Sequence, residues 1–205
     1  MGRTSSLKKR KKRTEKVAVW TQPLLQKIKY ADLNKVTMTD LAKLMGKSKS
    51  TVYEYFTTKQ ELFEYITIHR IRQLSSYQIE IEIATVDFEV YIANFINILT
   101  EGTRDISAHY LSQLKTHFKA SWNLVMDFLK RILKDLQILY TRGIEQGIFH
   151  NISTELITKL DEYFIIQLIT DYRFVEQSGQ SLQKLIKDYL FLKFEGLKIR
   201  NASLL

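Results

Sequence analysis

The chain has 205 residues, of which 45% are apolar and 26% charged, with a formal net charge of +9, one Pro, 7 Gly and no Cys. This length can bury a core across one small and one medium domain, and the low Pro and Gly content favours a helical protein. The composition excludes a disulfide framework, thiolate chemistry and a zinc finger, which fits a reducing cytoplasm, and no apolar run approaches the roughly 20 residues of a membrane span.

The positive charge is concentrated at the N-terminal end. Residues 1–60 hold 15 Lys and Arg against 4 Asp and Glu, a net charge of +11, whereas residues 61–205 hold 16 against 18, a net charge of −2. Seven of these cations lie in residues 1–13, which have no apolar pattern and no apolar segment behind them of the kind a secretory signal needs. We expect a disordered basic arm over residues 1–14 that adds affinity for a polyanion. A solubilising tail and a nuclear-localisation-like patch are the alternatives.

A first helix is expected within residues 15–31. Trp20 and Ile28 belong to an apolar stripe at helical spacing. Pro23 interrupts this pattern, and proline is tolerated in a first turn but not in a helix interior. We therefore expect the regular helix to begin near Thr21, after a turn or a kinked segment.

Residues 37–61 (TMTDLAKLMGKSKSTVYEYFTTKQE) contain three helix starts. Thr37 followed by Asp40 is a capping box with Asp in the place of Glu. Apolar residues then recur at helical spacing until Gly46, which can take the left-handed conformation that ends a helix. The spacing predicts a first short helix between Thr37 and Gly46.

A second short helix is expected over residues 49–56, because Ser48 can cap it. Thr58 and Glu61 form a further capping box for the helix that follows. A helix, a tight glycine turn and a second short helix are the layout of a helix-turn-helix.

The surface of this second helix carries cations, hydroxyls and phenols, with Val52 and Phe56 as its apolar anchors. Such side chains suit phosphate oxygens and base edges. The alternative is an ordinary solvated helix in a small bundle. The residues that carry these cations, hydroxyls and phenols are Lys49, Ser50, Thr51, Tyr53 and Tyr55.

This stretch resembles the DNA-binding domain of the TetR family of bacterial transcriptional regulators. The family signature is T-x-x-x-[IL]-A, then G-x-S-x-x-T-x-Y-x-Y-F, then a Lys that opens the next helix. It is filled by Thr37, Leu41, Ala42, Gly46, Ser48, Thr51, Tyr53, Tyr55, Phe56 and Lys59. The sequence departs from the family in two places: Asp32 and Leu33 replace the usual Gly and aromatic residue, and Ser50 replaces the common Gly, Ala or Pro.

The resemblance implies a set of DNA-binding residues: Thr37, Thr39, Lys47, Ser48, Lys49, Ser50, Thr51, Tyr53, Tyr55 and Lys59. Thr37 and Thr39 are expected near the DNA backbone. Residues 49–51 are placed to reach base edges, and Tyr53, Tyr55 and Lys59 are placed for phosphates. The partner would be double-stranded DNA, with residues 15–60 as the DNA-binding domain.

Helical periodicity continues to the end of the chain, so we expect an all-α fold with residues 61–205 as a larger ligand-binding and dimerisation domain. The expected helices cover 59–82, 86–99, 103–118, 122–145, 153–176 and 182–199.

The last two of these helices are apolar over more than one stripe, which indicates deep burial or contact with a partner. The alternative is that these helices belong to the core of the monomer. The resemblance implies that the pair forms a homodimer interface, which would place two recognition helices on a palindromic site. It also implies a pocket for a small, apolar effector in the central helices. For any single aromatic residue there, plain core packing is the better explanation.

Nothing in the sequence points to catalysis or metal binding. The pair His109 and His117 is a weak signal, and no hydrolase, zincin or phosphate-loop motif is present. We therefore expect no enzyme activity, no cofactor and no metal in a cytoplasmic repressor controlled by an effector. The alternatives are a nucleoid-associated or architectural DNA-binding protein on the same fold, and a helical interaction protein that does not use the motif.

Overall fold

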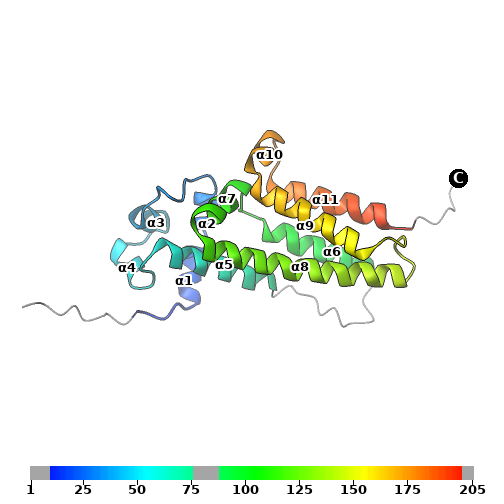
Figure 1. Cartoon of the computed structure of the whole chain (residues 1–205). Coiled ribbons are helices and arrows are strands. Elements are labelled where there is room, and N and C mark those ends of the chain that lie inside the picture. Colours follow the sequence, from blue (N-terminus) through cyan, green and yellow to red (C-terminus); the bar gives the residue numbers. More distant parts are fainter. Residues whose placement is uncertain (1–9, 76–87, 200–205) are drawn as a thin grey trace, which may run out of the picture.

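The computed structural model describes residues 10–75 and 88–199 (Figure 1). Within these ranges the secondary structure is helical apart from one antiparallel β-bridge between Phe149 and Lys198. The helices are α1 (Glu15–Thr21), α2 (Leu24–Ile28), α3 (Met38–Leu44), α4 (Lys49–Tyr53), α5 (Lys59–Ser75), α6 (Phe88–Gly102), α7 (Ala108–His117), α8 (Lys119–Glu145), α9 (Thr154–Thr170), α10 (Tyr172–Gln177) and α11 (Leu182–Leu197).

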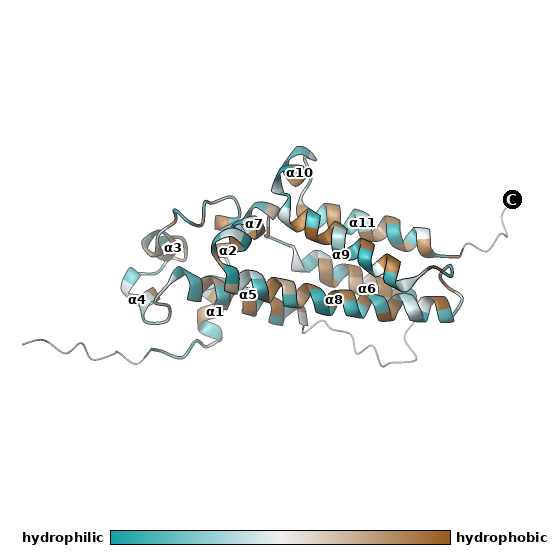
Figure 2. Cartoon of the chain, in the orientation of Figure 1, coloured by the Kyte–Doolittle hydropathy of each residue, from teal (hydrophilic) through white to brown (hydrophobic). Residues whose placement is uncertain are grey.

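Helices α1 to α4 form a small unit at one end of the molecule, and α5 runs from it into a larger helical bundle (Figure 1). In the bundle α5 packs on α6 and α8, α8 on α9, and α6 on α11. Apolar residues recur along these helices (Figure 2). The predicted all-α architecture, a helix-turn-helix unit followed by a larger helical domain, is confirmed. The expected boundary at residue 60 falls in the first turn of α5, so one helix is shared by both units.

The small unit has its own core. Ile28, Leu41, Val52 and Phe56 are each 0% exposed, and they come from α2, α3, α4 and the turn after α4. Burial of side chains of this size from each element is what holds such short helices together, because isolated helices of five to seven residues are unstable in water.

Pro23 ends the first helix rather than delaying its start. Glu15–Thr21 is a regular helix, and the Thr21 hydroxyl donates to the carbonyls of Val17 (3.0 Å) and Ala18 (3.2 Å). The prediction of a turn or kink before Thr21 was wrong. Proline has no N–H to donate to the carbonyl four residues before it, so the break falls between α1 and α2.

Two further boundaries differ from the expected ones. The helix predicted over 153–176 is divided at Asp171, whose backbone leaves the helical region and whose carboxylate accepts from the Phe174 N–H (3.1 Å) as the cap of α10. Helix α7 begins after Ser107, which accepts from the Tyr110 N–H (3.0 Å). The predicted helical residues 76–82 and 86–87 lie outside the described residues.

No helix in the described parts of the chain is both long enough and apolar enough to cross a membrane.

Candidate nucleic-acid interface

The helix-turn-helix is shaped by capping at each of its corners. Thr37 and Asp40 form the predicted capping box: the Thr37 oxygen accepts from the Asp40 N–H (3.2 Å), and the Thr37 N–H donates to the Asp40 carboxylate (3.0 Å). Hydrogen bonds from Thr37 hold the pKa of Asp40 below its usual range. Gly46 has φ +65°, and the Lys47 N–H donates to the Ala42 carbonyl (2.9 Å) across the turn. A side chain at Gly46 would be strained in this left-handed conformation.

Helix α4 is fixed at its start by a cluster of hydroxyls. Ser48 accepts from the Thr51 N–H (3.1 Å), and its oxygen lies 2.9 Å from Ser50 Oγ and 2.8 Å from Thr51 Oγ1. Because Val52 and Phe56 are fully buried, the helix has one anchored face and presents these hydroxyls on the other.

The predicted DNA-binding residues divide into two groups by exposure. Thr37, Lys47, Ser48, Lys49, Ser50 and Tyr53 are exposed, whereas Thr39, Thr51, Tyr55 and Lys59 are half-buried. The Lys49 ammonium lies 5.8 Å from the centroid of the Tyr53 ring, and Tyr53 itself is 40% exposed. The exposed side of α4 and of the turn before it therefore offers cations, hydroxyls and a phenol on one surface.

Tyr55 also serves as a packing residue. Its ring meets Trp20 of α1 edge to face, with centroids 5.9 Å apart, and Trp20 also contacts Phe56 at 6.1 Å. The first helix thereby braces the end of α4.

Lys59 has a structural role that sequence reasoning missed. Its ammonium donates to the carbonyls of Leu33 (2.9 Å) and Asn34 (2.8 Å), which fastens the start of α5 to the turn before α3. Burial lowers the pKa of Lys59, and Asp32 opposes this shift. Two of its three donors are used inside the protein, so one remains for an external acceptor.

Part of the basic arm docks on the end of α4 and the first turn of α5. Arg10 and Arg13 contact the Glu61 carboxylate at 2.6 and 3.2 Å, and the Lys11 ammonium lies 2.7 Å from the Glu54 carboxylate. The Lys11 N–H also donates to the Glu54 carbonyl (3.1 Å). The expectation of a disordered arm over residues 1–14 is therefore wrong for residues 10–13, and residues 1–9 lie outside the described residues. These partners are 43 to 51 positions apart in the chain, so no local pattern could have found them.

The bundle contains a cavity of about 140 Å³ whose walls come from α2, α5, α6, α7, α8, α9 and α11. Ile66 and Leu74 of α5, Leu129 of α8 and Ile165 of α9 are part of its apolar lining. Tyr110 and Phe128 are the aromatic members of this lining, whereas Tyr163 is 67% exposed on α9.

Helices α9 and α11 expose an apolar face, which we call the α9–α11 face. On α9 its members follow a spacing of four, three and one residues, so they share one side of the helix. In Figure 2 apolar residues recur along both helices. The face consists of Leu156, Leu160, Tyr163, Phe164, Phe191 and Leu192, with exposed fractions between 37% and 70%.

A buried ion pair lies behind this face. The Asp161 carboxylate is 0% exposed and accepts from the phenols of Tyr140 and Tyr189 (both 2.5 Å) and from the Lys193 ammonium (2.7 Å). Burial lowers the pKa of Lys193, and Asp161 opposes this shift. Sequence reasoning missed this cluster, although an acidic residue between Ile157 and Ile165, four positions from each, was a signal.

The chain is similar in sequence to known bacterial regulators. Residues 31–66 match the family model described as bacterial regulatory proteins, tetR family. The HTH-type transcriptional regulator YvaF of Bacillus subtilis (strain 168) is 24% identical over 60% of this chain and 66% of that protein, just under two thirds of its length.

Solved structures share the fold over most of the chain. The TetR family transcriptional regulator PfmR from Thermus thermophilus has a TM-score of 0.64 and 18% identity, covering 88% of this chain and 99% of that one. A transcriptional regulator from Saccharomonospora viridis in complex with choline has a TM-score of 0.68 and 14% identity, covering 92% and 100%. The helix-turn-helix of this chain therefore matches the tetR family of bacterial regulatory proteins, and the chain shares the fold of solved TetR family transcriptional regulators.

Proposed function

We propose that this regulator is a cytoplasmic repressor that binds a palindromic operator as a homodimer and releases it when a small, apolar effector occupies the bundle cavity. The observation that carries the proposal is the division of α4 into two faces. Val52 of α4 and Phe56 in the turn after it are completely buried, while Lys49, Ser50 and Tyr53 are exposed on the other face. This geometry suits insertion of α4 into a major groove.

The residues of the interface take different roles in this proposal. Lys49, Ser50 and Thr51 read base edges from the first turn of α4. Tyr53 and Tyr55 hold phosphates, as do Thr37 and Thr39 at the start of α3. Lys47 and Ser48 lie in the turn, where their exposed groups reach the backbone of the DNA. Lys59 contributes its one remaining donor.

The α9–α11 face supports a two-fold dimer. Monomeric proteins rarely expose large contiguous apolar patches, so exposed apolar side chains gathered on two adjacent helices mark an interaction site. A symmetric dimer through this face would carry two α4 helices and so add the binding energy of two half-sites.

Helix α5 supports control by an effector. Ile66, Arg70 and Leu74 contribute to the cavity wall, while Leu62 and Phe63, one turn earlier in the same helix, are 0% exposed near the helix-turn-helix unit. An effector releases DNA only if it binds more tightly to a state in which the two helix-turn-helix units no longer fit the operator. A shift of α5 would couple effector binding in the cavity to release of the DNA.

Binding to specific and scrambled DNA tests the roles assigned to α4. The operator is first selected from a random pool, where a palindrome is the expected product. We expect Tyr53→Ala to weaken binding to both sequences and to reduce the salt dependence, and Lys49→Ala to change the preference by about 1–3 kcal/mol. Isotherms at several salt concentrations measure both.

Equal affinity of the wild type and Tyr53→Ala for both DNAs would contradict the proposal. Broad genomic coverage without a palindrome would instead favour an architectural DNA-binding protein, and no salt-dependent binding at all would favour an interaction protein.

The docked arm leads to a separate prediction. Glu54 follows the recognition helix directly, so its charge would repel phosphates unless Lys11 offsets it. We expect Lys11→Ala to weaken operator binding several-fold, and Glu54→Gln to remove most of this effect when combined with it. A double-mutant cycle at constant salt measures the coupling. If the two effects add without coupling, Lys11 acts on DNA directly. Lys12→Ala serves as the matched control, because it removes an exposed cation of the same segment.

A further inference from the structure

Residues 10–13, which we call the docked segment, supply hydrogen-bond donors to the chain that leaves α4. The Lys11 N–H donates to the carbonyl of Glu54 (3.1 Å), and the Arg13 Nε donates to the carbonyl of Tyr55 (3.0 Å). Glu54 is the C-cap residue of α4, and carbonyls at a helix end have no partner within the helix. The docked segment therefore satisfies the C-cap carbonyl and the next one, and a helix of five residues depends on such outside contacts.

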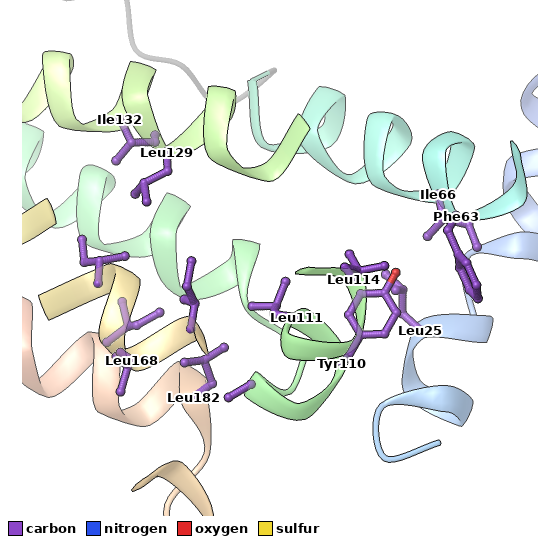
Figure 3. Packing of buried hydrophobic residues seen from close by; sticks show 14 of the residues in the cluster. Leu25, Phe63, Ile66, Tyr110, Leu111, Leu114, Leu129, Ile132, Leu168 and Leu182 are labelled. Atoms are coloured by element: carbon purple, nitrogen blue, oxygen red, sulfur yellow. The ribbon is translucent and has the colours of Figure 1, made fainter. Parts of the chain in front are cut away.

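Arg13 makes three contacts at once with different parts of the helix-turn-helix unit. Besides the bond to Tyr55, its Nη2 lies 3.2 Å from the Glu61 carboxylate in the first turn of α5. Its guanidinium carbon lies 4.7 Å from the centroid of the Phe56 ring, which is fully buried in the core of the small unit (the neighbouring core is shown in Figure 3). A planar guanidinium with a rigid fork of donors can make these contacts together, whereas the ammonium of a lysine has no plane to stack on the ring.

Glu61 holds the same arrangement from the side of α5. Its carboxylate accepts from the Thr57 N–H (2.8 Å) and from Arg10 (2.6 Å), in addition to Arg13. Burial acts to raise the pKa of Glu61, but the bonds from Thr57 and Arg10 outweigh it, so this pKa lies below its usual value. One carboxylate thereby joins the docked segment, the turn after α4 and the start of α5.

We propose that Arg13 is a positioning residue for the reading of DNA: it fixes the direction of α4 through Tyr55 and Glu61, and it is not itself a phosphate contact. Its side chain is 31% exposed and is already paired with a carboxylate, so little of it is left for DNA. The inference rests on the proposed function, which assigns base reading to α4. Base edges carry the sequence information and phosphates carry none, so a misdirected α4 loses affinity for the operator rather than for DNA in general.

Arg13→Lys tests this role, because it keeps the charge and removes the planar fork. Binding to the selected operator and to scrambled DNA is measured at several salt concentrations. We expect the variant to bind the operator about tenfold more weakly and scrambled DNA within about twofold of the wild type, because charge-assisted bonds that align α4 are lost. Arg72→Lys, the same change at an exposed arginine of α5, should leave both affinities unchanged.

Glu61→Gln gives a result of opposite sign under the two explanations. The change removes a negative charge from the basic end of the molecule, so electrostatics alone predicts tighter binding to both DNAs. We expect instead about fivefold weaker binding to the operator, because Arg13 loses its carboxylate partner, and scrambled DNA bound at least as tightly as by the wild type. Glu15→Gln removes the same charge from a side chain that is 94% exposed and should not weaken operator binding.

Hydrogen exchange without DNA measures the hold on α4 directly. The N–H groups of Glu54 and Phe56 donate to carbonyls of α4. We expect these amides to exchange about five to ten times faster in Arg13→Lys and in Glu61→Gln, because local opening of the helix end becomes easier. Amides of α8 should exchange as in the wild type, which also shows that both variants are folded.

Three results would overturn the inference. The first is an equal loss of affinity for operator and scrambled DNA in Arg13→Lys, which would make Arg13 a DNA contact. The others are unweakened operator binding in either variant, and unchanged exchange at the end of α4. Failure of the proposed function is a different result: a wild-type protein that binds both DNAs equally would contradict it, while the exchange rates would still decide whether Arg13 holds α4.

Discussion

Leu192→Glu is expected to make the protein monomeric in solution and to weaken binding to a palindromic operator by more than about 100-fold, since each tenfold loss corresponds to roughly 1.4 kcal/mol. Leu192 is 70% exposed on α11, so the substitution leaves the protomer core intact. In a two-fold interface the new carboxylate is present twice and is buried without a partner, which costs several kcal/mol. A monomer retains one α4 and therefore the binding energy of one half-site.

The control for this experiment is Phe174→Glu. Phe174 is 46% exposed on α10, outside the α9–α11 face, so the same charge introduced there should preserve both the dimer and operator binding. Sedimentation measures the mass, and binding to full and half operators measures the affinity. A dimer that survives Leu192→Glu with unchanged affinity would rule out this face as the interface.

Asp161→Ala is expected to lower the free energy of unfolding by about 3–5 kcal/mol, the usual cost of leaving one member of a buried ion pair alone. The Lys193 side chain is 10% exposed and depends on Asp161 as its carboxylate partner. Its ammonium lies 5.0 Å from the Tyr140 ring centroid and 5.2 Å from that of Tyr189, and these rings replace only part of the lost interaction. The pair joins α9 to α11, so we also expect a weaker dimer.

Urea unfolding of the single and double variants separates the ion pair from general packing. Lys193→Met should cost less than Asp161→Ala, because two phenols still donate to Asp161. Combining Asp161→Asn with Lys193→Met should be less destabilising than the sum of the single changes, since no charge remains buried. Loss of less than about 1 kcal/mol in Asp161→Ala would show that water reaches the site and screens the pair.

The helix-turn-helix could be predicted almost completely from the sequence. Its corners depend on contacts between residues three or four positions apart, as between Thr37 and Asp40 or Ser48 and Thr51. Such capping contacts are local, so a short sequence window contains all their partners. The buried positions Val52 and Phe56 likewise follow from helical spacing.

Helix interruptions were less predictable, because competing local preferences decide them. Pro23 could have been placed in a first turn or after a last one, and the structure shows both, because it follows the last turn of α1 and is the N-cap residue of α2. Asp171 divides the helix predicted over 153–176 in a similar way, by capping α10 with its own carboxylate.

The sequence by itself determined the fold class, the short helix α4 and its exposed chemistry, because these follow from periodicity and from neighbours along the chain. Only the tertiary structure decided that Lys59 fastens a turn, that Lys11 faces Glu54 and that Asp161 meets Lys193. The physical reason is that burial and charge pairing depend on which distant segments pack together. The charge or hydrogen bond of a side chain acquires its energetic weight only once that packing has removed it from water.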